Sequence, residues 1–193
     1  MNRKEFLTTV LCSGTGAVAC SALPCCGLTN QTNKAENENK TAAADETLKF
    51  ADAWVKRMMT VVDSQLDPSS RERLLENMGR ACYIAQHGPR PAEVPAGSLD
   101  RLIARLKKWA GEEGVRRAEN AIHFTYGPAG ADKRRCLCPM VESITEGLSP
   151  TYCQCSTGYV REMFEQATGK SVEVTLTESL KRGGKACRFL IQL

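Results

Sequence analysis

The sequence has no apolar run long enough to cross a bilayer as a helix. The uncharged N-terminal stretch from Phe6 to Ala19 spans 14 residues, whereas a membrane-spanning helix needs about 20. Aromatic residues make up only 6% of the chain and are not interleaved with a basic stripe. Aromatic residues within a basic stripe are typical of nucleic-acid-binding surfaces. We therefore expect neither a membrane span nor a nucleic-acid partner.

Internal repeats are absent too, apart from two similar cysteine pairs, and no local motif identifies a catalytic nucleophile. The 193 residues are 42% hydrophobic and 25% charged, with a formal net charge of +4. This composition is typical of a globular protein, and the length favours one domain. The expected partner is a small molecule or a metal ion, while enzymatic activity and oligomeric state stay open.

The N-terminal segment has the features of an export signal. A basic start at Arg3 and Lys4 precedes the apolar stretch, and Ala17-Val18-Ala19 supplies small residues before Cys20. Residues 3–7 resemble a twin-arginine motif with lysine in the second position, and a general secretory signal is the alternative. We expect removal of residues 1–19 and an exported protein, either periplasmic or tethered to the membrane by a lipid on Cys20.

A polar leader and three helices are predicted to follow the signal. Residues 20–45 lack a periodic apolar face and are predicted to be flexible. Apolar residues at helical spacing predict a helix over about 46–66, a second from Asp67-Pro68 to Gly88, and a third that Ser98 caps. Residues 46–193 are predicted to form a single Cys-rich domain.

From Val115 the sequence pattern changes from helical spacing to near alternation, which is typical of strands. Residues 122–126 and 134–138 are predicted to form a hairpin, and Ser149-Pro150 to begin a helix that ends at Gly169. Two more strands are predicted over 172–177 and 186–192. The fold class is therefore α+β, with N-terminal helices followed by a small antiparallel sheet and one crossing helix.

Six of the ten cysteines fall within the predicted domain. They are Cys82, Cys136, Cys138, Cys153, Cys155 and Cys187. Two pairs have one intervening residue, and such neighbours share a face of a strand or can both turn toward one point at a helix start. Four converging thiolates would suit zinc or an iron–sulfur cluster, although zinc pairs are usually spaced more widely.

The cysteine pattern leaves three interpretations open. The first is a metal site on the two pairs, with Cys187 as a fifth member. The second is a disulfide framework, which is common in exported proteins. The third is a thiol-dependent hydrolase with His123 or His87 as its base. Cys82, which lies between apolar neighbours on a predicted helix, is expected to be buried and to stand outside the site.

The C-terminal part of the chain carries a resemblance to known families. The segments that carry it are 155–160, 172–174, 178–179, 182–184 and 187–191. They resemble 4-vinyl-reductase-like ligand-binding domains and bacterial thiazoline-carboxylate hydrolases, and the doubled pairs resemble an uncharacterised Cys-rich bacterial family.

That resemblance implies binding of a small hydrophobic ligand or a metal, or hydrolysis of a cyclic amidine-like bond. Cys187 would match the late cysteine of these families, Gly183 or Gly184 their turn glycine, and Phe189 their core aromatic residue. Ser179 stands where many relatives have a second cysteine.

Overall fold

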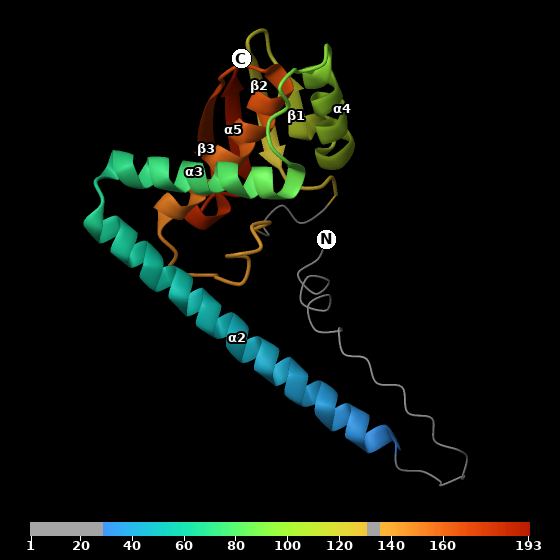
Figure 1. The fold of residues 1–193 in the computed structure, drawn as a ribbon, viewed down its shortest axis with the longest axis vertical. Helices are drawn as coiled ribbons and strands as arrows, with labels where there is room; N and C mark the ends of the chain where they lie inside the picture. The colour runs from blue at the N-terminus through green and yellow to red at the C-terminus, as the bar shows by residue number, and fades with distance from the viewer. Residues whose placement is uncertain (1–28, 131–135) are drawn as a thin grey trace. The chain divides into compact units, whose positions relative to one another are not determined.

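The structure is a computed structural model that describes residues 29–130 and 136–193. The chain divides into two compact units between Ala51 and Asp52, and the first described helix, α2 (Thr29–Gln65), runs through that boundary (Figure 1). Residues 29–45, which we expected to be flexible, are therefore helical. Several alanines and the absence of glycine and proline favour a helix here. The rest of the expected leader lies outside the described residues.

Two further helices confirm the pattern read from the first half of the sequence. Helix α3 (Pro68–His87) begins at Asp67, whose Oδ1 accepts hydrogen bonds of 3.0 Å from the backbone amides of Ser69 and Ser70. Helix α4 (Ser98–Ala110) begins differently from the prediction, because Gly97 occupies the capping position and the Ser98 hydroxyl donates to the Pro95 carbonyl at 2.7 Å. None of the described helices is both long and apolar enough to span a membrane.

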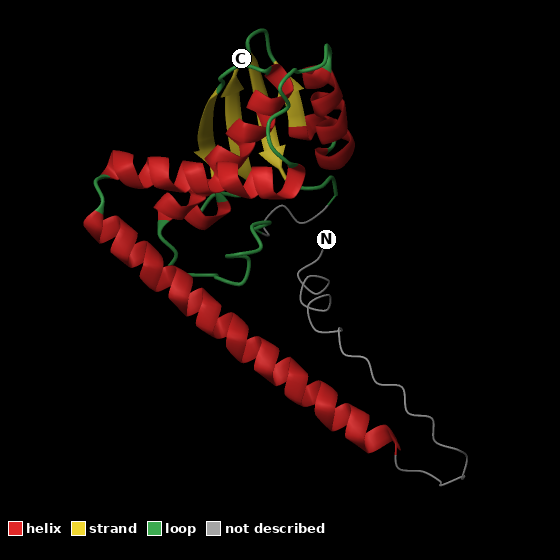
Figure 2. Ribbon diagram, in the orientation of Figure 1, coloured by secondary structure: helices red, strands yellow, loops and turns green. Residues whose placement is uncertain are grey.

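The four described strands form one antiparallel sheet in the order β1-β2-β4-β3 (Figure 2). Its strands are β1 (Val115–Arg117), β2 (Ala121–Tyr126), β3 (Glu173–Glu178) and β4 (Cys187–Gln192). The α+β class and the small antiparallel sheet are thus confirmed. Short 3-10 turns, η1 (Glu112–Gly114) and η3 (Leu180–Arg182), precede β1 and β4.

The hairpin expected between residues 122–126 and 134–138 is wrong. Cys136–Cys138 are not in a strand, residues 134 and 135 lie outside the described part, and β2 pairs with β1 and β4 instead. The reason is that β4 offers β2 matching apolar partners on one face, with Ile122 opposite Ile191 and Phe124 opposite Phe189. The segment Cys136-Leu-Cys138-Pro139 offers no such series.

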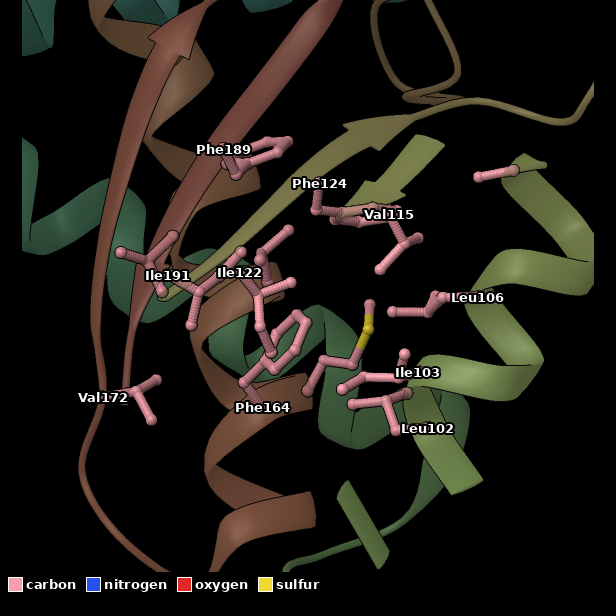
Figure 3. Close-up of a cluster of buried hydrophobic side chains, with 14 of the residues drawn as sticks. Leu102, Ile103, Leu106, Val115, Ile122, Phe124, Phe164, Val172, Phe189 and Ile191 are labelled. Atoms are coloured by element: carbon pink, nitrogen blue, oxygen red, sulfur yellow. The ribbon is translucent and has the colours of Figure 1, made fainter. Parts of the chain in front are cut away.

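Helix α5 (Gln154–Thr168) follows the 3-10 turn η2 (Pro150–Cys153) and packs on the apolar face of the sheet. Figure 3 shows Phe164 of this helix facing Ile122 and Ile191 of the sheet, with Leu102 and Leu106 of α4 closing the other side. His123 points to the opposite, exposed face of the sheet, as its place in the strand alternation predicts.

A second, smaller apolar cluster fixes the loop that follows Cys138. Val141 and Ile144 of this loop are buried against Val55 and Met59 of α2 and against Leu75 of α3. Cys136 and Cys138 pack against this smaller cluster, whereas Cys187 packs against the larger core. The cysteines therefore lie where the two clusters adjoin.

Candidate functional site

The five predicted metal ligands come together from three separate parts of the chain. Cys136 and Cys138 lie in the loop before Val141, Cys153 and Cys155 lie at the junction of η2 and α5, and Cys187 is the first residue of β4. All five, together with Cys82, are free thiols. No disulfide joins the described cysteines.

Mutual electrostatic effects among the cysteines, together with contacts to Ser179 and Tyr152, define this group. The Ser179 hydroxyl donates to the Cys153 sulfur at 3.0 Å, and the Cys138 sulfur lies 3.9 Å from the Tyr152 hydroxyl. The charge that Cys136 would carry acts on both Cys153 and Cys187, and that of Cys138 acts on Cys155. We refer to Cys82, Cys136, Cys138, Cys153, Cys155 and Cys187 together as the thiol group.

Backbone amides point at several of these sulfurs. The N–H groups of Met140 and Val141 bond to the Cys138 sulfur, that of Cys138 bonds to Cys136, and that of Leu180 bonds to Cys187. Each of these hydrogen bonds favours the thiolate over the thiol. Such N–H donors are also the outer-shell partners that stabilise metal-bound sulfur.

Two cations lie beside the thiol group and are fixed by backbone carbonyls. Lys181 donates to the carbonyl of Ile144, and the Arg182 Nε donates to the carbonyl of Pro150 at 2.8 Å. Both favour the thiolate of Cys153, and Lys181 also favours that of Cys136. A negatively charged thiolate centre would thus have compensating charge nearby.

Burial nevertheless dominates the titration of these thiols. Loss of solvation raises the pKa of Cys136, Cys138, Cys153 and Cys187 above the usual thiol range. Burial, followed by the charges of Cys138 and Cys82, raises the pKa of Cys155 to about 12. These five side chains are therefore protonated at neutral pH, and a metal that binds them must displace protons.

The thiol group is not a preformed coordination sphere. Within residues 29–130 and 136–193, no three His, Cys, Asp or Glu side chains are positioned to hold a metal ion. Cys136, Cys138, Cys153, Cys155 and Cys187 are neighbours whose side chains would have to rotate to ligate one ion.

Cys82 departs from the sequence-based prediction in two ways. It is exposed rather than buried, and its side chain bonds to that of Cys155 while its charge acts on Cys138. The prediction that Cys82 is buried is therefore wrong, and its side chain reaches Cys155, whereas the prediction that it is not a metal ligand stays a prediction. A closer look at the sequence offers a signal for this contact, because Gly79 precedes Cys82 by three residues and Gly158 follows Cys155 by three.

These two glycines explain why Cys82 reaches the thiol group. A Cβ on Gly79 would lie 1.8 Å from the carbonyl oxygen of Cys155, and one on Gly158 would lie 1.8 Å from the carbonyl oxygen of Glu76. Only glycine permits helices α3 and α5 to approach so closely. Cys82 is one turn beyond Gly79 on the same face of α3, which brings it to Cys155.

Neither histidine contacts any of the cysteines that the structure describes. His123 is exposed on the outer face of the sheet, opposite Arg116 and Leu190. His87 Nε2 lies 3.0 Å from the Tyr159 hydroxyl, and its ring also contacts Tyr83. Among the described residues, the general base that a thiol-dependent hydrolase would need is therefore not hydrogen-bonded to any cysteine.

A buried ion cluster joins helices α3 and α5. Glu162 and Glu165 are each only 3% exposed. Arg80 bonds to both carboxylates, at 2.7 and 2.8 Å, and Arg90 bonds to Glu165 at 2.6 Å. Burial alone would raise the pKa of Glu165, but the hydrogen bonds from Arg80 and Arg90 outweigh it and leave that pKa below its usual value.

Replacing Arg80 with methionine should destabilise the protein by about 3 kcal/mol, because the buried carboxylates of Glu162 and Glu165 would each lose a positively charged partner. The pKa of Glu165 is lower in the folded than in the unfolded protein. The ionised carboxylate therefore contributes to folding stability above the unfolded-state pKa, and this contribution is lost as the pH falls through the folded-state pKa. Urea unfolding at several pH values should show the largest difference between wild type and Arg80→Met near neutrality. Arg73→Met, at an exposed position where the Arg73 guanidinium donates to the Ser70 hydroxyl at 3.1 Å, is the control. An equal effect of the two substitutions would contradict the assignment.

Comparison with known proteins assigns the chain to a family without assigning it an activity. The model of a family of unknown function, DUF6144, matches residues 29–193, and the chain therefore belongs to that family. No curated protein and no solved structure matches the chain. The resemblance to 4-vinyl-reductase-like domains and thiazoline-carboxylate hydrolases stays a prediction.

Proposed function

We propose that this protein binds a soft metal, as zinc or as an iron–sulfur cluster, through the thiols of Cys136, Cys138, Cys153 and Cys155, with Cys187 as a further ligand. The observation that carries the proposal is the convergence of these thiols, free of disulfides, from a loop, a helix start and a strand. Thiolates select this class of metal, and four of them complete a zinc or cluster site.

The surroundings of the thiol group support the same proposal. Backbone N–H groups of Met140, Val141 and Leu180 already bond to cysteine sulfurs, and such bonds persist when sulfur binds a metal. Lys181 and Arg182 would balance the negative charge of a tetrathiolate centre. With Cys82 the group holds more thiols than one four-coordinate ion needs, so the zinc and cluster alternatives both have enough ligands.

A nucleophilic thiol has less support. Burial raises the pKa of the five predicted ligands, whereas a nucleophilic cysteine needs a lowered pKa or an adjacent base. Neither His87 nor His123 fills that role in the described contacts.

Export belongs to the proposal as well. Residues 1–19 would direct the chain out of the cytoplasm, and Cys20 would carry a lipid if the protein is tethered. An oxidising compartment promotes disulfides, and a metal bound to the thiol group would protect it from oxidation. Residues 1–28 lie outside the described part of the structure.

Titration of the reduced, metal-free protein with cobalt(II) tests metal binding by thiolates. We expect an intense sulfur-to-cobalt charge-transfer band that saturates at a fixed ratio, together with the release of protons. Because the pKa values of the free thiols are raised, the apparent affinity should fall as the pH falls, by up to about tenfold per pH unit for each proton displaced. Protein alkylated with iodoacetamide is the control. Cobalt binding that does not depend on pH and shows no charge-transfer band would contradict the proposal.

A further inference from the structure

A cleft of about 490 Å³ lies between helices α3, α4 and α5, and no cysteine lines it. Its volume is within the range of small-molecule sites in proteins, about 300–1,000 Å³. The cleft is not part of the thiol group, and the proposed metal function makes no use of it. Its lining combines two arginines, an aromatic ring and several apolar side chains.

Positive charge in the cleft comes from Arg101 and Arg105, which are one turn apart on α4 and so share a face. Arg101 is held in place by the carbonyl of Ala96 at 2.9 Å and by the Ser98 hydroxyl at 2.8 Å. Arg105 bonds to the hydroxyl of Tyr83. All of these partners are neutral, and each guanidinium has five N–H donors, so both retain donors for a ligand.

The described lining of the cleft carries no negative charge that would oppose these arginines. Among the described residues, no carboxylate lines the cleft or forms a salt bridge with Arg101 or Arg105. Glu162 acts on Tyr83 from nearby, but Arg80 and Arg90 bind its carboxylate. Burial, and then the charge of Arg105, lowers the pKa of His87, so this ring is neutral at neutral pH.

The remaining wall of the cleft is partly apolar, with Gln166 and Ser98 as its polar members. Leu102 and Met163 are 4% and 7% exposed, and Ala167 and Pro91 complete the lining on that side. A ligand that fills the cleft would therefore meet two cations at one part of its surface and aliphatic carbon at another.

We propose that this cleft binds a small organic carboxylate with an apolar body. The carboxylate would lie against the guanidinium groups of Arg101 and Arg105, whose planar forks match it in geometry. The apolar body would lie against Leu102 and Met163. A carboxylate with an apolar body fits better than a phosphate, because the neutral His87 adds no charge and Leu102 and Met163 offer an apolar contact beside the two arginines.

Isothermal titration calorimetry with 4-phenylbutyrate tests this proposal, with 4-phenylbutanol as a neutral analogue of the same shape. The acid should bind, and the alcohol should bind at least tenfold more weakly. Arg105→Met should weaken binding of the acid at least tenfold and leave binding of the alcohol unchanged. Arg73→Met, at an arginine outside the cleft on α3, should behave as wild type. Thermal unfolding would verify that both variants are folded, as expected for exposed side chains.

Several outcomes would overturn the proposal. They are equal affinity for the acid and the alcohol, unchanged binding of the acid by Arg105→Met, and no binding of the acid at millimolar concentration. Inorganic phosphate is the competing probe. If phosphate displaced 4-phenylbutyrate at equal or lower concentration, the cleft would be an anion site without selectivity for an apolar carboxylate, and the proposal would fail.

Discussion

Replacing Cys138 with serine is expected to empty the proposed metal site and to lower the free energy of unfolding by several kcal/mol, on the scale of losing a structural metal. Cys138 is the substitution of choice because it links both parts of the thiol group. Its charge acts on Cys136 and Cys155, and its sulfur accepts the N–H groups of Met140 and Val141. Serine keeps the size of the side chain but replaces a soft ligand with a hydroxyl.

Metal content and unfolding of the purified Cys138→Ser protein would be measured against those of Ser143→Ala. Ser143 lies on the same loop, and its hydroxyl donates to the Asp52 carboxylate at 2.8 Å on the surface. The control should retain the metal and lose only about 1 kcal/mol of stability. Full metal content in Cys138→Ser would show that Cys138 is not a ligand. Loss of metal in both variants would mean that the loop, rather than the thiol, determines binding.

Gly79→Ala is the second substitution with a large expected effect, and its direction is diagnostic. In the interior of an exposed helix, alanine in place of glycine stabilises by about 1 kcal/mol. At Gly79 the new methyl group would lie 1.8 Å from the Cys155 oxygen and 2.7 Å from the Tyr159 nitrogen, both of them backbone atoms that cannot rotate away. Helices α3 and α5 would have to separate, and we expect a destabilisation of about 2–4 kcal/mol.

Urea unfolding of Gly79→Ala and of Asn77→Ala, an exposed position on the same helix, would measure this effect. Asn77→Ala should be neutral or slightly stabilising, because alanine is the better helix former. Because the clash is with the backbone of Cys155, the Gly79 variant should also displace this proposed ligand, so its cobalt complex should form more weakly. Stabilisation by Gly79→Ala would show that the two helices do not cross there as closely as described.

Local sequence signals predicted the elements of this fold more completely than their pairing. The cap at Asp67, the apolar spacing on α4 and the alternation in β2 each act over a few residues, and each of these elements is confirmed. The partner of β2 was wrong because pairing depends on a strand more than sixty residues away, whose inward side chains match it. The start of α2 was missed because a helix without a periodic apolar face looks like a flexible tether in sequence.

In the candidate site, too, local sequence signals were more informative than long-range contacts. The one-residue spacing within each Cys pair predicted that the four thiols can converge on one site. In the structure these thiols and Cys187 lie close enough for their charges to act on one another, while the metal site itself stays a prediction. The inclusion of Cys82 could not be inferred from its apolar neighbours. It follows from the crossing of α3 and α5 at Gly79 and Gly158, which is a property of two surfaces rather than of one segment.

The metal content of the protein, isolated from its natural compartment without added metal, tests the central claim most directly. Elemental analysis would be combined with a thiol titration of the native and the unfolded protein. The account predicts zinc or iron in near-stoichiometric amount, and reaction of the five proposed ligand thiols with the reagent only after unfolding or chelation. Metal-free protein in which Cys136, Cys138, Cys153, Cys155 and Cys187 all titrate freely, or in which they form disulfides, would contradict it.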